Sequence, residues 1–390
     1  MHLFVNSLAA SAGGGLTYIR NVLPQLAKRS DLRVTVALGH GLQDELSDHE
    51  NISFVELQAP LARRFWFEQS QLPVLIRKSG ADVLLSTGNF ALRNSPVPQL
   101  LLSRNSVYTS QDFYRDLRSR HKYRTWLDTR MRAILAKQSI RWADLTIAPS
   151  ESFAAELRRW SGRNVIAIHH GFDREAFTRD FNPLPSEVDG KLVAPPNTLK
   201  LLFVSHYNYY RNFETLIRAL PILRNRLAGR PVRLWLTCRL QFGANPGAYD
   251  PRSTAALVKS LDVSDMVVEL DAVPYNLLHH LYSRADLYVS PAYTETFAHP
   301  LVEAMATGLP VLASDLPVHR EICGDAAVYF PTFSPEELSE TIVKLAASSE
   351  VRQRIVDFGR ERSKTFSWAK HVDAILKLSQ GQMNSKRKSG

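Results

Sequence analysis

The sequence has few cysteines, because only Cys238 and Cys323 occur among its 390 residues. This scarcity excludes a disulfide scaffold and is typical of a reducing compartment. No uninterrupted apolar run approaches the roughly 20 residues that span a bilayer. The first 19 residues contain no Asp, Glu, Lys or Arg, but Asn6, Ser7 and the glycines at 13–15 interrupt them. They also lack a basic N-terminal region, so we expect no signal peptide.

The balance of residue types excludes a disordered or collagen-like chain and predicts a soluble globular protein. Hydrophobic residues make up 45% of the chain and charged residues 22%. At about 150 residues per domain, the length predicts two domains, or three. The net charge of +10 is typical of proteins that bind nucleic acid, an anionic membrane or a phosphorylated molecule. Much of the excess is local, because the segment 104–141 has ten Lys or Arg against three Asp or Glu.

Short β-rich runs alternate with amphipathic helical stretches along most of the chain. This alternation predicts parallel βαβ units, in which helices cover both faces of each sheet. The expected strands are 3–6, 32–38, 52–57, 81–86, 97–103, 145–148, 164–168, 199–205, 232–238, 267–270, 287–290, 310–313 and 327–330. The expected helices are 17–29, 67–78, 111–142, 152–160, 212–223, 254–261, 276–284, 300–307, 317–322 and 335–347.

A proline-containing polar stretch without periodicity interrupts the alternation near the middle of the chain. We therefore predict a Rossmann-like domain at 1–180, a linker at 181–198, a second Rossmann-like domain at 199–365 and a disordered basic tail at 381–390. The predicted fold class is α/β, with two doubly wound sheets. Open parallel sheets bind ligands beyond the carboxyl ends of their strands, so the site is expected in a cleft between the domains.

The stretch 288–330 carries the most chemical information. After its first strand, a loop contains Glu295, and a helix is expected to begin at Pro300. The N-terminus of that helix, at 297–299, would point out of the carboxyl edge of the sheet and suit a diphosphate. Glu295 and Glu303 flank this position. Their carboxylates could accept hydrogen bonds from sugar hydroxyls on one side and from a ribose on the other.

Four motifs, in this order along the chain, resemble the retaining glycosyltransferases of family 4, which have the GT-B fold. They are Gly13-Gly14-Gly15 before a helix, Ile168-x2-Gly171-Phe172-Asp173-x3-Phe177, Phe203-Val204-Ser205-His206-Tyr207-x3-Arg211-Asn212, and Glu295-x7-Glu303 followed by Ala304-Met305-Ala306-x-Gly308-x-Pro310. The resemblance covers nearly the whole chain. It implies two Rossmann-like domains that face each other across a cleft. It also implies a C-terminal helix, at 366–380, that packs back on the N-terminal domain.

The resemblance further implies a role for each matching residue. Glu303 would bind the ribose of a nucleotide, Glu295 would bind hydroxyls of the donor sugar, and Arg211 would neutralise the diphosphate. We take Glu295 and Arg211 as the catalytic pair. The other donor-binding positions would be Phe297, Ala298, His299, Gly14, Gly15, Ser205, His206, Val273 and Pro274. The resemblance implies no metal ion and no other cofactor, since fixed positive groups replace the metal.

Three positions depart from the family pattern. His206 stands where Arg is usual, and Ala298 stands where Gly is common. Many members have a His at the end of a strand of the N-terminal domain, close to the reacting carbon. This chain has Ser103-Arg104-Asn105 there, so we assign no catalytic His.

These features predict a cytoplasmic hexosyltransferase of mannosyl or glucosyl type. It would act with retention, from a nucleotide-diphosphate sugar to a glycan or lipid-linked acceptor in cell-surface polysaccharide biosynthesis. The basic segment 104–141 contains interleaved aromatic residues and predicts peripheral attachment to an anionic membrane, with an ordinary packed basic helix as the alternative. A GT-B nucleotide-sugar epimerase or a phosphorylase remains an alternative function. A nucleic-acid-binding protein is disfavoured, because no RNA-binding signature is present.

Overall fold

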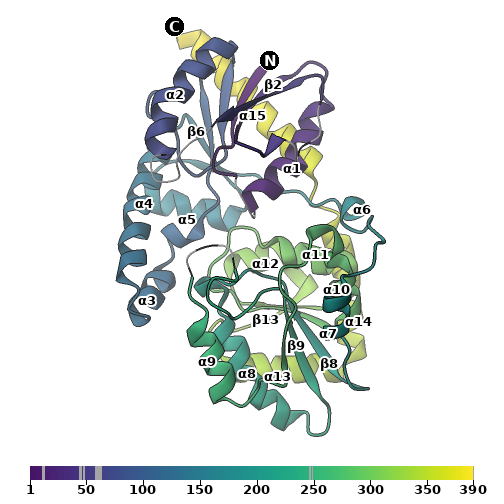
Figure 1. The fold of residues 1–390 in the computed structure, drawn as a ribbon. Coiled ribbons are helices and arrows are strands. Elements are labelled where there is room, and N and C mark those ends of the chain that lie inside the picture. Colours follow the sequence, from purple (N-terminus) through teal and green to yellow (C-terminus); the bar gives the residue numbers. More distant parts are fainter. Residues whose placement is uncertain are drawn as a thin grey trace. The chain divides into compact units, whose positions relative to one another are not determined.

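The computed structural model describes residues 1–10, 14–43, 46, 49–57, 64–245, 247 and 249–389, with the backbone alone at 386–389. Gly13 of the glycine motif lies outside the described residues. The chain divides into two compact units (Figure 1). The first comprises Met1–Ser110, His121–Gly171 and Ser367–Gly390, and the second comprises Gln111–Arg120 and Phe172–Phe366.

The first unit is built on a parallel seven-stranded sheet of order β3-β2-β1-β4-β5-β6-β7. Its strands are β1 (His2–Asn6), β2 (Arg33–Gly39), β3 (Ile52–Leu57), β4 (Val83–Ser86), β5 (Gln99–Leu102), β6 (Leu145–Ala148) and β7 (Val165–Ala167). The central strands are short apolar runs that are buried on both faces, as a helix-covered sheet requires. The helices of this unit are α1 (Gly14–Ala27), α2 (Arg64–Ser79), η3 (Ser106–Tyr108), α4 (Tyr123–Trp142), α5 (Glu151–Ser161) and α15 (Trp368–Ser389).

The second unit contains a parallel six-stranded sheet of order β10-β9-β8-β11-β12-β13. Its strands are β8 (Leu199–Phe203), β9 (Val232–Leu236), β10 (Val267–Glu269), β11 (Leu287–Ser290), β12 (Val311–Ser314) and β13 (Ala327–Phe330). Its helices are α3 (Gln111–Ser119), α6 (Arg174–Phe177), α7 (Ser186–Lys191), η4 (Tyr209–Arg211), α8 (Phe213–Arg226), α9 (Arg252–Ser260), η5 (Tyr275–Leu277), α10 (Leu278–Arg284), α11 (His299–Thr307), α12 (Pro317–Cys323), η6 (Gly324–Ala326), α13 (Pro335–Ala347) and α14 (Ser349–Ser363). The two doubly wound sheets confirm the predicted α/β fold class.

Local sequence explains where several helices begin and end. The Ser150 hydroxyl accepts the Phe153 amide at the start of α5, and the Ser334 hydroxyl accepts the Glu337 amide at the start of α13. Helix α5 ends at Gly162, whose φ of 70° is the left-handed conformation that glycine adopts without strain. None of the helices within the described residues is long and apolar enough to cross a membrane.

The helix predicted at 111–142 is wrong as a single element, because the chain breaks into α3 and α4. Between them His121 has a left-handed φ of 54°. Helix α3 belongs to the second unit, although the sequence places it inside an N-terminal domain of 1–180. The reason is a set of tertiary contacts that spacing does not reveal. Phe113 and Leu117 of α3 are fully buried, and the Tyr293 hydroxyl donates to Asp116 at 2.8 Å. Arg120, which directly follows α3, lies 2.7 Å from Asp116 and 2.8 Å from Glu214 of α8.

Two further segments differ from the prediction. The linker predicted at 181–198 contains the short helix α7. Helix α15 continues through Ser389, so the tail predicted to be disordered from 381 is helical up to that residue. Lysine, arginine, glutamine and methionine in this tail favour helix, and no proline interrupts it. Within the first unit, α15 packs against α1, where the Tyr18 hydroxyl lies 3.0 Å from His371 Nε2.

Gly171 of the Gly-Phe-Asp motif has a structural explanation. A Cβ atom at this position would lie 2.1 Å from the backbone nitrogen of Trp368, so only glycine allows the chain segments to cross here. Asp173 accepts the Ala176 amide and caps α6. This motif therefore holds Gly171 against the start of α15 in the first unit and begins α6 in the second.

Candidate functional site

An arginine and a glutamate from two neighbouring loops form the centre of the candidate site in the second unit. Arg211 lies in the loop after β8, and Glu295 lies in the loop after β11. Arg211 Nη1 is 2.6 Å from Glu295 Oε1, and the two side chains are 21% and 11% exposed. Strands β8 and β11 are neighbours where the strand order reverses, so the loops that follow them meet at the carboxyl edge of the sheet.

The ion pair with Glu295 keeps the Arg211 guanidinium positively charged. Burial disfavours a charged guanidinium, but the attraction of Glu295 outweighs it and raises the pKa of Arg211 above its ordinary value. Its Nε atom is buried and has no hydrogen-bond partner among the described residues. Arg211 therefore keeps a charged donor for one more oxygen atom.

Asn212 fixes the two loops against each other. Its backbone has a left-handed φ of 56°, which asparagine tolerates better than most residues. Its Nδ2 atom donates to the carbonyls of Pro291, at 2.9 Å, and Thr332, at 2.8 Å. A glycine would adopt this left-handed backbone equally well. The sequence alone does not reveal the two carbonyl contacts, which are tertiary.

Glu303 is almost completely buried in the second turn of α11, with 3% of its surface exposed. Its Oε2 atom accepts a 2.7 Å hydrogen bond from the Tyr282 hydroxyl, and the Tyr275 side chain also hydrogen-bonds to it. Burial raises the pKa of Glu303 to about 7, because the tyrosine hydrogen bonds compensate for lost solvent only in part. Its carboxylate is suited to accept further hydrogen bonds. The sequence does not single out either tyrosine.

Tyr288 of β11 connects Glu303 with the Arg211–Glu295 pair. Its ring stacks on that of Tyr282, with centroids 5.7 Å apart. Burial raises the pKa of the Tyr288 hydroxyl, and the charges of Arg211, Glu303 and Glu295 all act on it. The structure thus brings the three charged residues expected from the sequence into one region of the second unit.

The segment 297–299 leads into α11. Ala298 has φ 65° and ψ 60°, and it provides no side-chain cap for the helix. The N-terminus of α11 can therefore receive an anion. The Phe297 ring is buried between those of His299, at 4.8 Å, and Phe366, at 5.3 Å. A left-handed backbone explains why Gly is common at position 298, and alanine there carries a strain of about 1–2 kcal/mol.

Ser205 and His206 lie in the loop after β8. The Ser205 amide donates to Thr237 Oγ1 at 2.9 Å, and the Ser205 hydroxyl donates to the His206 carbonyl at 2.7 Å. Loss of solvent and the neighbouring Arg211 cation lower the pKa of His206. His206 is therefore mostly uncharged at pH 7 and does not supply the positive charge of the Arg that is usual at this position.

Val273 and Pro274 immediately precede η5, whose first residue is Tyr275. Tyr275 hydrogen-bonds to Glu303, so these two positions lie next to the residues that surround that carboxylate. Val273 packs on the core of the second unit.

Gly14 and Gly15 belong to the first unit, where they open α1. A Cβ atom at position 15 would lie 3.1 Å from Ala10 Cα, whereas one at position 14 would meet nothing within 4 Å. The Gly14 carbonyl accepts a 3.0 Å hydrogen bond from Arg104 Nη1. Close packing against Ala10 therefore explains the glycine at position 15. At position 14 there is room for a side chain, so packing does not explain the glycine there.

His319 of α12 is a buried group that the sequence does not single out. Its Nδ1 atom lies 2.9 Å from the Ser314 carbonyl, and its Nε2 atom has no partner among the described residues. Burial lowers the pKa of His319, and the charges of Glu295 and Arg211 act on it with opposite signs. The ring is thus a neutral neighbour of the ion pair.

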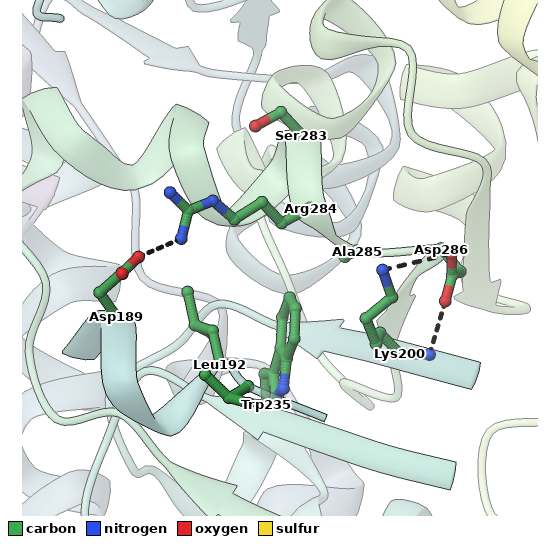
Figure 2. A pocket seen from close by; sticks show the side chains of 9 residues that line it. Asp189, Leu192, Lys200, Trp235, Ser283, Arg284, Ala285 and Asp286 are labelled. Carbon is green, nitrogen blue, oxygen red and sulfur yellow. Dashed lines mark hydrogen bonds and ion pairs between the residues drawn. The ribbon is translucent and has the colours of Figure 1, made fainter. Parts of the chain in front are cut away.

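A separate cavity of about 400 Å³ lies at the opposite ends of the strands, around the start of β8 and the residue before β11 (Figure 2). Arg284 pairs with Asp189 across it, and Lys200 pairs with Asp286. Both cations of this cavity already have counter-ions, so its charge does not select an anionic ligand. Within the described residues, no group of three or more His, Cys, Asp or Glu could hold a metal ion.

The two doubly wound sheets, joined along one chain, define the GT-B fold. Two family models match the chain: Glycosyltransferase Family 4 over residues 12–176, and Glycosyl transferases group 1 over residues 186–362. The chain belongs to the family 4 glycosyltransferases.

Individual relatives are distant. D-inositol 3-phosphate glycosyltransferase of Corynebacterium aurimucosum is 25% identical over 62% of this chain and 58% of its own length. The match therefore spans little more than half of that relative. Sucrose-phosphate synthase from Thermosynechococcus elongatus has a TM-score of 0.76 at 20% identity, over 99% of this chain and 100% of that one. The Anabaena protein HepE in complex with UDP-glucose has a TM-score of 0.72 at 17% identity, over 98% and 100%.

Proposed function

We propose that this chain is a retaining glycosyltransferase that moves a hexosyl group from a nucleotide-diphosphate sugar to a glycan or lipid-linked acceptor in cell-surface polysaccharide biosynthesis. The observation that carries the proposal is the largely buried pair of Arg211, from the loop after β8, and Glu295, from the loop after β11 that leads to the start of α11. The UDP-glucose complex of the similarly folded HepE supports a nucleotide sugar as donor.

In this proposal the second unit holds the donor and stabilises its leaving group. Breaking the glycosidic bond develops negative charge on the departing diphosphate. Arg211 and the N-terminus of α11 supply fixed positive charge at that point, which is most effective where water is excluded. Glu295 orients sugar hydroxyls and does not act as a nucleophile. Glu303 accepts hydrogen bonds from the ribose, and these are strengthened by its negative charge.

We also propose that transfer requires no metal ion, because the protein supplies the positive charge itself. Activity measured after treatment with EDTA is expected to equal that of the untreated enzyme. Loss of activity that added Mg²⁺ or Mn²⁺ restores would contradict this part of the proposal.

The donor is found by thermal-shift measurements against UDP-, GDP-, ADP- and dTDP-sugars, followed by a transfer or donor-hydrolysis assay. NMR of the product gives its anomeric configuration and distinguishes transfer from epimerisation or phosphorolysis. R211Q is expected to lose orders of magnitude in turnover and to remain folded by circular dichroism, with a melting temperature that is lower because Glu295 loses its ion pair. The control is R224Q, because Arg224 is an exposed arginine of the same unit that pairs with Asp265. A fully active R211Q enzyme would rule out the proposed site.

We further propose that the first unit attaches to an anionic membrane through α4. Four large apolar side chains recur on one face of this helix with 57–60% of their surface exposed: Tyr123, Leu127, Met131 and Ile134. Exposed basic residues lie on the same helix, namely Arg124, Arg130, Arg132 and Arg141. Such an arrangement buries apolar side chains among lipid tails and places cations near the headgroups.

The membrane proposal is tested by co-sedimentation with vesicles of neutral lipid, with and without anionic lipid. Wild-type protein is expected to bind only the anionic vesicles and to dissociate as salt increases. L127E is expected to abolish binding. The matched variant V193E carries the same change at an 80% exposed side chain of the second unit and is expected to bind normally. Absence of binding at low salt would refute the attachment.

A further inference from the structure

Arg104 occupies a central place at the carboxyl edge of the first sheet. It follows β5 by two residues, and three parts of the first unit hold it. Its Nη1 atom donates to the Gly14 carbonyl at 3.0 Å, and its Nη2 atom donates to the Thr87 carbonyl at 2.9 Å. Its guanidinium carbon lies 4.9 Å above the centre of the Tyr18 ring. The guanidinium is therefore fixed in position.

This cation has no counter-ion in the described part of the chain, where no carboxylate lies within salt-bridge distance of it. Its Nε atom is buried and makes no hydrogen bond to any described residue. Burial lowers the pKa of Arg104, and only Tyr18 opposes this effect. Other arginines that are held as firmly, such as Arg120 and Arg211, are paired with carboxylates.

The described residues around Arg104 add no negative charge. His371, which the cation influences, is held neutral because burial lowers its pKa to about 4. The two groups that fix the guanidinium are backbone carbonyls, which carry no net charge. Helix α1 also begins beside it, and the positive end of a helix dipole favours an anion. A partly buried charge without a carboxylate partner still costs free energy, so an oxyanion from outside the chain would reduce that cost.

We propose that Arg104 binds a phosphate group of a substrate, through Nε and the remaining hydrogens of its guanidinium fork. This deepens the proposed function and rests on it for the identity of the substrate. The phosphate could belong to a phosphorylated or phospholipid-linked acceptor, or to the diphosphate of the donor. Both sources present the same chemistry to Arg104, and an arginine fork matches phosphate oxygens better than a lysine does.

The test compares wild-type protein, R104Q and R104K. R93Q is the control, because Arg93 is an exposed arginine of the same unit. Inorganic phosphate is titrated at constant ionic strength, with chloride as the reference anion, while the melting temperature is recorded. Arg211 is a second candidate phosphate ligand, so each titration is repeated in an R211Q background. A ligand that binds only the folded state raises the melting temperature as its concentration increases.

Wild type and R93Q are expected to be stabilised by phosphate over chloride, and R104Q is expected to lose at least tenfold in phosphate affinity. If R104Q does not fold, R104K must weaken phosphate binding several-fold. Equal phosphate binding by wild type and the position-104 variant would refute the proposal, as would wild-type protein that does not distinguish phosphate from chloride.

A parallel titration with UDP, or with the nucleotide found for the donor, identifies the source of the phosphate. Unchanged nucleotide affinity in R104Q assigns the site to the acceptor, and a tenfold loss assigns it to the donor diphosphate. Failure of the proposed glycosyl transfer would appear separately, as absence of turnover in a protein whose phosphate binding still depends on Arg104.

Discussion

Replacing Glu303 with glutamine is expected to stabilise the protein at pH 8 and to impair it as an enzyme. The carboxyl is buried, and its pKa rises from 4.5 to about 7. A rise of about 2.5 in pKa corresponds to roughly 3 kcal/mol, at 1.36 kcal/mol for each pH unit. Between pH 4.5 and pH 7 the folded state holds a proton that the unfolded state has lost, so stability falls as pH rises through this window. Glutamine cannot ionise and avoids this loss, and its side-chain oxygen can still accept the Tyr282 hydroxyl.

The stability difference between E303Q and the wild type should therefore be close to zero at pH 4.5 and should approach about 3 kcal/mol above pH 7. Hydrogen exchange of peptides from β11 and α11, measured at several pH values, reports unfolding of the second unit. The control is E361Q, because Glu361 is an exposed residue paired with Lys364 and should show no such trend. A difference between E303Q and wild type that does not change with pH would refute the reasoning.

The same substitution links stability to binding. If Glu303 accepts ribose hydroxyls as a carboxylate, nucleotide binding must release its proton at pH values below 7. Calorimetry at pH 6, in buffers of different ionisation enthalpy, should show release of nearly one proton by wild type and none by E303Q. Nucleotide affinity should fall about 10–100-fold in E303Q, since a hydrogen bond to a charged group contributes roughly 1.5–3 kcal/mol. Y282F should shift the midpoint of the wild-type pH dependence upward, because the Tyr282 hydrogen bond lowers the pKa of Glu303.

Two other substitutions test the strained and the charged contacts. A298G should leave stability within about 1 kcal/mol of wild type, because relief of the left-handed backbone offsets the lost methyl group. A304G, inside the following helix α11, should cost about 2 kcal/mol. Denaturant unfolding measures both changes. Equal losses for the two variants would contradict the strain at Ala298. R120Q should weaken the attachment of α3 to the second unit and raise hydrogen exchange across 111–119, at a cost of about 2–3 kcal/mol. R115Q, at a 73% exposed side chain, should change exchange little. Exchange across 111–119 that is the same in R120Q and wild type would contradict a stabilising role of Arg120.

The architecture was accessible from the sequence because strands in a helix-covered parallel sheet must be apolar along their whole length. The runs at 199–205 and 287–290, for example, predict β8 and β11 within two residues at each end. Neither run indicates that the two strands are neighbours. That pairing brings Arg211 to Glu295, 84 residues away along the chain, and only the motif resemblance anticipated it.

Other features of the site could not be predicted because they depend on tertiary contacts or backbone conformation. The sequence identifies Ala298 as unusual for the family, but the left-handed φ that makes it unusual is visible only in the structure. Tyr282 reaches Glu303 from a different helix, and nothing in the local sequence marks it as a hydrogen-bond donor. The place of α3 in the second unit depends on tertiary contacts, such as those of Arg120 with Glu214 and of Asp116 with Tyr293, whose partners lie far along the chain.

The unfavourable features of this protein are concentrated at the carboxyl edges of the two sheets. Ala298 carries backbone strain, Glu303 is a desolvated carboxyl, and Arg104 is a cation without a counter-ion among the described residues. Folding alone would not favour any of the three, because each lowers the stability of the ligand-free chain. Two of these costs fall when a molecule of matching chemistry binds: an oxyanion at Arg104 and hydroxyl donors at Glu303. The strain at Ala298 remains, but Ala298 provides no side-chain cap at the start of α11, where an anion can bind. A sugar nucleotide together with a phosphorylated acceptor would supply these groups, which agrees with the proposed substrates.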